Sequence, residues 1–189
     1  MQKYKLSNEY TIYKVKYDGD YPKESFIKRI NQNKSIINKI KDKNVENMVL
    51  IECDEFKSVN DSIVSILEII ENRKINSIAK TSWVYTQKSD FNMIMHKHDY
   101  LLYTTEKTKL KTEWTCVFYI QIPKKITKGE GDITFMTEDK KLHTFTPKEN
   151  DIIIFPGTLY HMVTPIPNAE IDRIVYASNF NFNFNLNNY

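Results

Sequence analysis

The sequence places two histidines one residue apart, and neutral histidine is a common ligand of transition metals. His96 and His98 lie in the stretch Met-Ile-Met-His-Lys-His-Asp, residues 93–99. On a strand, residues two apart point to one face, so Ile94, His96 and His98 are predicted to face inward. The opposite face would then carry Met93, Met95 and Lys97. Such a pair inside a barrel suits a metal, although similar pairs also occur on solvated faces.

A third histidine follows a hydrophobic strand that ends at a proline-glycine turn. The run Asp-Ile-Ile-Ile-Phe-Pro-Gly, residues 151–157, precedes His161. The turn ends the strand and redirects the chain, so that His161 can complete a metal site. The alternative is a surface histidine on a hairpin. His143 has polar neighbours and no partner spacing, and we expect it to be dispensable.

Arg173 opens an apolar strand, Arg-Ile-Val-Tyr-Ala-Ser-Asn, residues 173–179. If its side chain points inward it must meet an anion, because a buried, unpaired guanidinium is very costly. A carboxylate can meet this need through a two-pronged bond. The alternative is an exposed arginine paired with Asp172 or Glu170.

The first 80 residues combine strand and helix patterns. Alternation at Tyr13, Val15 and Tyr17 predicts a strand, and Pro22 stands where a helix favours proline. The apolar stripe of this helix is Phe26, Ile27, Ile30, Ile37 and Ile40. The run Val49–Ile51 predicts a short strand or turn. A second helix is expected from Asp61, with the stripe Ile63, Ile66, Leu67, Ile70 and Ile78. These side chains are interpreted as core.

From Ser82 onward the periodicity changes to two. The expected strands are 82–86, 91–98, 114–122, 132–136, 142–145, 151–155 and 173–180. Residues 179–189 form either a final edge strand or a frayed end. The pattern predicts an α+β protein with an antiparallel barrel or jelly roll. We expect one domain over residues 1–189, with the helical part at 1–80 supporting a β core at 81–189.

Composition places few limits on function. The chain has 189 residues, 41% of them hydrophobic, and a net charge of +3, too mild to indicate nucleic-acid binding. Cys53 and Cys116 lack CxxC spacing and are expected to be reduced, buried thiols. The sequence contains no long apolar run or secretion signal, so we expect no membrane partner and a cytoplasmic location.

Together these motifs resemble the iron(II) and 2-oxoglutarate-dependent oxygenases, and most closely the small oxygenase-like proteins of bacteriophages. The resemblance spans about residues 82–182 and rests on the order HxH, Phe155-Pro156…His161 and Arg173-Ile174…Asn179. Further matching stretches are 82–84, 116–123 and 131–135. The resemblance implies a double-stranded β-helix, a jelly-roll or cupin-like barrel, with the N-terminal helices packed on it. It would place the chain in the cytoplasm, or in the host cytoplasm if a phage or virus encodes it.

The resemblance also implies the roles of individual residues. His96 and His161 would bind Fe(II), while the middle position, usually a carboxylate, falls on His98. Either His98 is the third ligand, which we favour, or Asp99 reaches the metal, or the site is degenerate. Arg173 would bind the distal carboxylate of 2-oxoglutarate, with Tyr119 and Asn179 as further cosubstrate contacts; Tyr119 can equally be a wall aromatic.

The implied activity is a dioxygenase that hydroxylates an unidentified substrate, whether peptide, nucleobase, lipid headgroup or metabolite. A second hypothesis is a cupin-type metal protein or dioxygenase that does not use 2-oxoglutarate, with Glu106 as a candidate fourth ligand. A third is a non-enzymatic jelly-roll module whose histidines are incidental. Arg173 separates the first two, because a cupin has no need of it.

Overall fold

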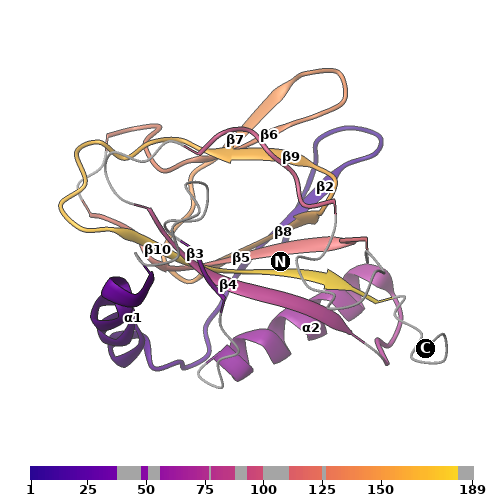
Figure 1. The fold of residues 1–189 in the computed structure, drawn as a ribbon. Helices are drawn as coiled ribbons and strands as arrows, with labels where there is room; N and C mark the ends of the chain where they lie inside the picture. The colour runs from indigo at the N-terminus through magenta and orange to yellow at the C-terminus, as the bar shows by residue number, and fades with distance from the viewer. Residues whose placement is uncertain are drawn as a thin grey trace.

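The chain forms two antiparallel sheets that face each other, with two helices against the outer face of the larger sheet (Figure 1). The computed structural model describes residues 1–37, 48–50, 56–76, 78–87, 93–99, 111–124 and 127–182. The larger sheet has the order β1 (Gln2–Lys5), β2 (Thr11–Lys16), β8 (Asp151–Pro156), β5 (Trp114–Gln121), β10 (Arg173–Asn181), β4 (Ala79–Gln87) and β3 (Met48–Leu50). The smaller sheet has the order β7 (Leu142–Phe145), β6 (Ile133–Met136) and β9 (Tyr160–Val163).

The central strands of the larger sheet are buried on both faces, which explains their nearly continuous apolar sequence. In β10, Ile174 and Tyr176 belong to the core on the helix side, whereas Val175 and Ala177 belong to the core between the sheets. Strand β8 divides its isoleucines between the same two cores. A strand covered on both sides favours apolar residues at every position, while its side chains still alternate between faces.

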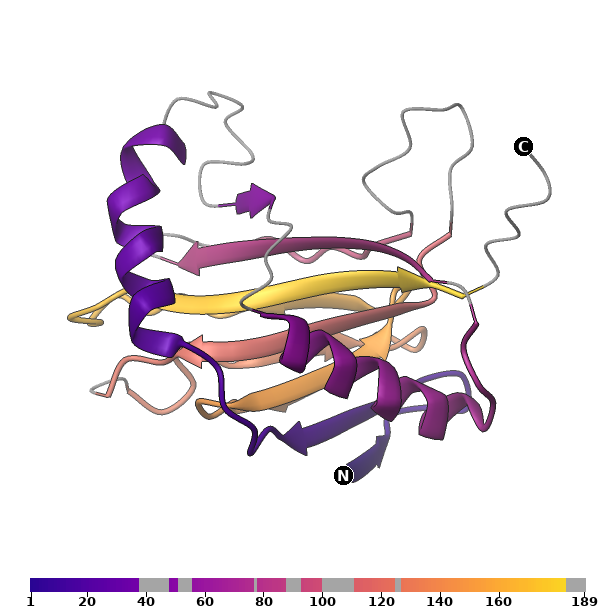
Figure 2. The ribbon, with the colours of Figure 1, turned by 90° about the horizontal axis from the view of Figure 1, so that it is seen from below.

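The helices α1 (Lys23–Ile37) and α2 (Lys57–Glu71) lie across the face of the larger sheet that is turned away from the smaller sheet (Figure 2). Helix α1 begins directly after Pro22, as expected. Helix α2 buries Val59, Ile63 and Leu67, which share one face, and it ends at Asn72 in the left-handed conformation, with φ 52°. Phe56 precedes α2 and stacks on Tyr176 of β10, with ring centroids 4.3 Å apart. The helices are therefore attached to the strand that carries Arg173.

The predicted helix boundaries need two corrections. Helix α2 starts at Lys57, four residues before the expected Asp61, and no side chain caps its first turn. Ile78 lies outside the helix and is 37% exposed, so it is not part of the predicted stripe. Ile40 of the first predicted stripe and Ile51 of the short run lie outside the described residues.

The predicted strand at 91–98 is wrong for its described part, 93–98. Residues 93–99 make one isolated bridge, between His96 and His161, and the chain bends at Met95. The predicted alternation therefore fails: Ile94 is 78% exposed, whereas Met93 packs against the core between the sheets. Strands β1 and β9, of four residues each, were not anticipated.

The last residues of the described chain are buried. Residues 179–181 continue β10, which has β4 and β5 on its two sides and is not an edge strand. Phe180 and Phe182 belong to the helix-side core, while residues 183–189 lie outside the described range. Cys116 is a buried free thiol, as expected, and Cys53 falls outside the described residues. Among the described helices, none combines the length and the apolar character that crossing a bilayer requires.

Candidate metal centre and a buried arginine

His96 and His161 are held together by their own backbones. The His96 N–H donates to the His161 carbonyl at 2.9 Å, and the His161 N–H donates to the His96 carbonyl at 2.8 Å. Residues paired in this way project to the same side of the ladder. Their ring centroids lie 4.3 Å apart, so this single bridge brings two distant parts of the sequence together as one side-chain pair.

The third imidazole joins this pair through a close contact at the proline-glycine turn. The His98 N–H donates to the Gly157 carbonyl at 2.8 Å, and the His98 ring centroid lies 5.0 Å from those of both other histidines. A Cβ atom on Gly157 would stand 2.5 Å from Thr112 Cγ2 and 2.8 Å from the His98 carbonyl oxygen. Glycine is therefore required here by close approach, and it allows residues 96–98 to lie against the end of β8.

The environment keeps two of these imidazoles neutral. Burial, reinforced by the neighbouring His96, lowers the pKa of His98 to about 3. Burial first, and then His98 and His96, lower the pKa of His161 well below its usual value. Neutral imidazole is the form that binds a metal, so these shifts favour the ligand form at neutral pH.

Two of the rings are also oriented by backbone carbonyls. His96 Nδ1 lies 2.9 Å from the Ile94 carbonyl oxygen, and His161 Nδ1 lies 3.1 Å from the Leu159 carbonyl oxygen. Each Nδ1 must carry a proton to make such a bond, which leaves the Nε2 lone pair free. Histidine ligands are commonly oriented by a second bond of this kind.

The donor atoms of the three histidines can converge on one ion. One ligand atom from each of His96, His98 and His161 lies within 4.8 Å of the others. Three imidazoles suit iron, zinc, copper or nickel rather than calcium or magnesium. Asp99, the other candidate for the middle position, is outside this group, and its carboxylate lies 3.0 Å from Lys97 Nζ. His143 is also outside the group, and it pairs with Phe135 in the smaller sheet.

Arg173 is buried between the sheets, with only 2% of its surface exposed. Its Nη1 donates to Gln87 Oε1 at 2.8 Å, and its guanidinium lies over the Tyr119 ring at 5.0 Å from the centroid. The described residues provide no carboxylate partner for it, and its Nε has no hydrogen-bond partner among them. The alternative of an exposed arginine paired with Asp172 or Glu170 is therefore wrong.

Tyr119 adds a second unused polar group beside this cation. Its side chain is fully buried, and its hydroxyl has no hydrogen-bond partner among the described residues. Burial raises the pKa of Tyr119, while the nearby Arg173 acts in the opposite direction. The tyrosine is therefore a neutral hydroxyl, able to donate to the same acceptor as the guanidinium.

Asn179 occupies the inner face of β10 farther along the strand. Its Oδ1 accepts a hydrogen bond from Thr115 Oγ1 at 2.8 Å, and its Nδ2 has no partner in the described part of the chain. Between Arg173 and Asn179 lies Ala177, which pairs with Trp83, whose ring centroid is 5.4 Å from that of His98. A strand rises by about 3.3 Å per residue, so Arg173 lies about 13 Å along β10 from Ala177, the residue at the level of Trp83 and His98.

The sequence did not reveal every residue at this site. Gln87 and Thr115 were missed because each is identified by the residue that it faces across the strands, and Thr112 because it is identified by its approach to Gly157. For Gln87 the register Arg173↔Gln87 between β10 and β4 decides its position. The only available signal was its place at the end of a strand that begins near Ser82.

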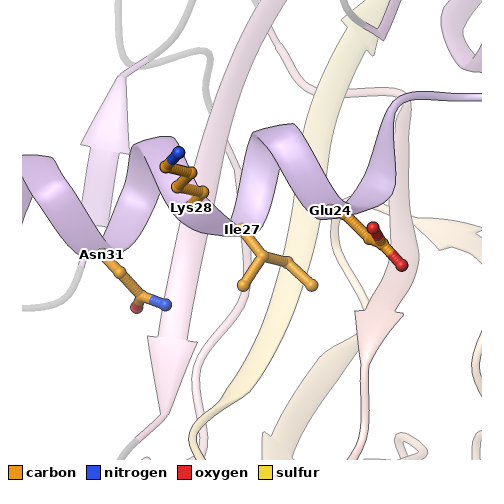
Figure 3. Close-up of a pocket in the computed structure, with 4 residues that line it drawn as sticks. All are labelled: Glu24, Ile27, Lys28 and Asn31. Atoms are coloured by element: carbon orange, nitrogen blue, oxygen red, sulfur yellow. The ribbon is translucent and has the colours of Figure 1, made fainter.

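A separate hollow lies on the helix side of the molecule. It has a volume of about 560 Å³ and is lined by Glu24, Ile27, Lys28 and Asn31, all on α1 (Figure 3). None of these residues belongs to the histidine group, which lies between the two sheets. The hollow therefore contributes nothing to the candidate site.

Comparison with known proteins places this architecture among solved structures. No protein-family model matches the sequence, and no curated protein matches it. The structure is similar to the viral collagen prolyl hydroxylase of Paramecium Bursaria Chlorella virus-1 in its 2-oxoglutarate complex, with a TM-score of 0.57, 15% identity and coverage of 89% of this chain and 94% of that one. It is also similar to a Pseudomonas putida prolyl-4-hydroxylase, with a TM-score of 0.61, 10% identity and coverage of 89% and 91%.

A third similar structure was solved with iron bound. HygX from Streptomyces hygroscopicus matches with a TM-score of 0.58, 10% identity and coverage of 92% of this chain and 82% of that one. Identities this low establish the fold and not the activity. This chain therefore has the fold of the 2-oxoglutarate and iron(II) oxygenases.

Proposed function

We propose that this chain is a non-haem iron(II) and 2-oxoglutarate-dependent dioxygenase that hydroxylates a substrate still to be identified. The observation that carries the proposal is Arg173, a buried cation with no carboxylate partner among the described residues. An uncompensated guanidinium between two sheets is costly unless an anion occupies the space beside it. A dicarboxylate that binds a metal at one end and this cation at the other fits that need.

The residues present also fit an iron ion. The Nε2 atoms of His96 and His161 are left free by their Nδ1 contacts, and His98 completes the group. The set differs from the common pair of histidines with one carboxylate, because all three ligands are neutral. It therefore adds no negative charge, and we expect the site to depend on an anionic cosubstrate for charge balance.

Residues of the protein would position the 2-oxoglutarate cosubstrate. Arg173 and Tyr119 would both donate to the distal carboxylate of 2-oxoglutarate, and the apolar wall of Val175 and Ala177 would exclude water. The unused Nδ2 of Asn179 would donate to a further oxygen acceptor of the cosubstrate. When bound, Fe(II) and 2-oxoglutarate supply the oxidising chemistry, in which dioxygen is consumed, succinate and carbon dioxide form, and a substrate C–H bond is hydroxylated.

We further propose that the two sheets form a double-stranded β-helix in one domain over residues 1–189, with the N-terminal helices as its support. The facing antiparallel sheets, the stacking of Phe56 on Tyr176 and the similar solved structures support this description. We place the protein in the cytoplasm, with a small-molecule cosubstrate as its first partner.

The test is a calorimetric titration of 2-oxoglutarate into protein loaded with manganese(II), a redox-inert substitute for iron(II). Saturable binding that requires the metal is expected, and the iron(II) form should convert 2-oxoglutarate to succinate once a substrate is supplied. If the protein binds metal but no 2-oxoglutarate, the oxygenase proposal fails and the cupin-type hypothesis replaces it. Glu106, the fourth ligand in that hypothesis, lies outside the described residues.

A further inference from the structure

The partner of the buried cation is a neutral amide, although a carboxylate of almost the same shape would pair with it better. Gln87 is fully buried at the end of β4, directly opposite Arg173 in the register of β4 and β10. Its Oε1 accepts from Arg173 Nη1 at 2.8 Å. A glutamate here would form a buried ion pair and satisfy the guanidinium from within the protein.

The nitrogen of the Gln87 amide also makes a hydrogen bond, which helps to hold the side chain in place. Its Nε2 donates to the Thr164 carbonyl at 3.1 Å, so the amide spans from Arg173 to the residue that follows β9. Strand β9 carries His161. Both polar atoms of the Gln87 side chain are therefore engaged, which fixes the amide in one orientation with its oxygen toward the guanidinium.

The guanidinium keeps further capacity after this bond is made. Arg173 Nε has no partner among the described residues, and neither does the neighbouring Tyr119 hydroxyl. Gln87 therefore bonds one nitrogen of the guanidinium and, being neutral, does not cancel its positive charge.

We propose that Gln87 is a positioning residue that orients Arg173 while keeping its charge available to an incoming carboxylate. The neutrality of position 87 is then a requirement of anion binding at Arg173, because a glutamate placed there would compete with the ligand for the guanidinium. This inference rests on the proposed function in its choice of 2-oxoglutarate as the anion. The requirement for a neutral partner follows from the Arg173 environment alone.

The experiment compares Gln87→Glu with Gln87→Met in two measurements. The first is calorimetric titration of 2-oxoglutarate into manganese-loaded protein, and the second is thermal unfolding of the ligand-free protein. Gln87→Glu should weaken 2-oxoglutarate binding by about tenfold or more, because it removes the benefit of at least one charge-assisted bond. The same variant loses the bond to the Thr164 carbonyl but should unfold at a higher temperature than Gln87→Met, since its carboxylate pairs with a buried cation.

Gln87→Met should weaken binding and also lower the unfolding temperature, because it removes both hydrogen bonds and adds no charge. Both variants lose the bond to the Thr164 carbonyl, so a higher stability of Gln87→Glu than of Gln87→Met reports the pairing of its carboxylate with Arg173. Gln2→Glu is the matched control: it makes the same chemical change at an exposed position on β1, the far edge of the same sheet. This control should alter neither measurement.

The outcomes separate the two proposals. If wild type and Gln87→Glu bind 2-oxoglutarate equally, the inference is overturned while the proposed function stands. If wild type binds no 2-oxoglutarate, the proposed function fails and the unfolding data decide the inference alone. In that case a Gln87→Glu variant no more stable than Gln87→Met overturns it, and a more stable one supports a buried cation that is available to another anion.

Discussion

His96 and His161 exchange two backbone hydrogen bonds, of 2.9 and 2.8 Å, across an otherwise isolated bridge. The pair is thus fixed by main-chain geometry before any ion binds. Mutating their side chains should therefore remove ligands without disturbing the backbone contact that brings them together.

The first prediction concerns metal binding by this pair. The double variant His96→Ala with His161→Ala should lose stoichiometric binding of iron(II) or manganese(II), because a single remaining imidazole cannot hold either ion tightly. Metal content after gel filtration measures this. His143→Ala is the control and should retain full stoichiometry. Retention of metal by the double variant would show that the ligands lie elsewhere.

The second prediction ranks the candidates for the middle ligand. His98→Ala should reduce metal affinity far more than Asp99→Ala, because His98 joins the histidine group and Asp99 pairs with Lys97. Competition with a coloured chelator gives both affinities. The reverse order would assign the carboxylate to the metal. His98→Asp restores the common ligand pattern and should still bind iron(II).

The third prediction concerns anion binding by Arg173. Arg173→Ala should lose about 1.5–3 kcal/mol of 2-oxoglutarate binding for each charge-assisted bond removed. Arg173→Lys should lose less, because lysine keeps the charge but not the planar fork. Anaerobic titration of the metal-loaded variants measures both. Metal content should stay unchanged, and equal affinity in wild type and Arg173→Ala would place the anchor elsewhere.

The fourth prediction compares two tyrosine hydroxyls on opposite faces of the larger sheet. Tyr119→Phe removes a buried hydroxyl without a partner, so ligand-free stability should be unchanged or higher while 2-oxoglutarate binding falls about tenfold. Tyr176→Phe is the counterpart on the helix side, where the hydroxyl donates to Asn60 Oδ1 at 3.0 Å. It should lose about 1 kcal/mol of stability and bind 2-oxoglutarate normally. Unaltered binding by Tyr119→Phe would make Tyr119 a wall aromatic.

The fifth prediction tests the attachment of the helices to the sheet. Phe56 has no exposed surface, stacks on Tyr176, and meets Phe26 edge to face at 4.4 Å. Phe56→Ala should therefore lower the free energy of unfolding by about 3–5 kcal/mol. Chemical denaturation measures this loss. Metal stoichiometry should persist well below the melting temperature, and a loss under 1 kcal/mol would mean that the helices contribute little to the fold.

The sequence predicted the long strands and failed where tertiary contacts decide the structure. Strands β5, β8 and β10 were found because burial on both faces leaves an unmistakable apolar run. The stretch 93–99 was expected to be a strand because of its histidine spacing, yet one bridge to His161 and one bond to Gly157 position it. Histidines 96 and 98 meet as expected, but by a bend and not by regular alternation.

The sequence pointed to the three histidines that the structure groups together and to the buried Arg173, Tyr119 and Asn179, but not to Gln87. Arg173 could be found because a cation in an apolar strand has few stable explanations. Gln87 could not, because a glutamine at a strand end has many, and only the register with Arg173 selects among them. The partners of a buried charge are set by pairing across strands, which local periodicity does not encode.

The alternating sequence of β10 places two sets of side chains on opposite faces of the sheet. Arg173 and Asn179 face the space between the sheets, while Ile174 and Tyr176 pack against the helix layer. A slip of one residue would exchange the two sets and bring an isoleucine to the position of the guanidinium. Insertions and deletions in β10 are therefore far more damaging than substitutions. The stacking of Phe56 on Tyr176 forms only in the native register, so the contact between the helix layer and β10 favours the register that also turns Arg173 inward.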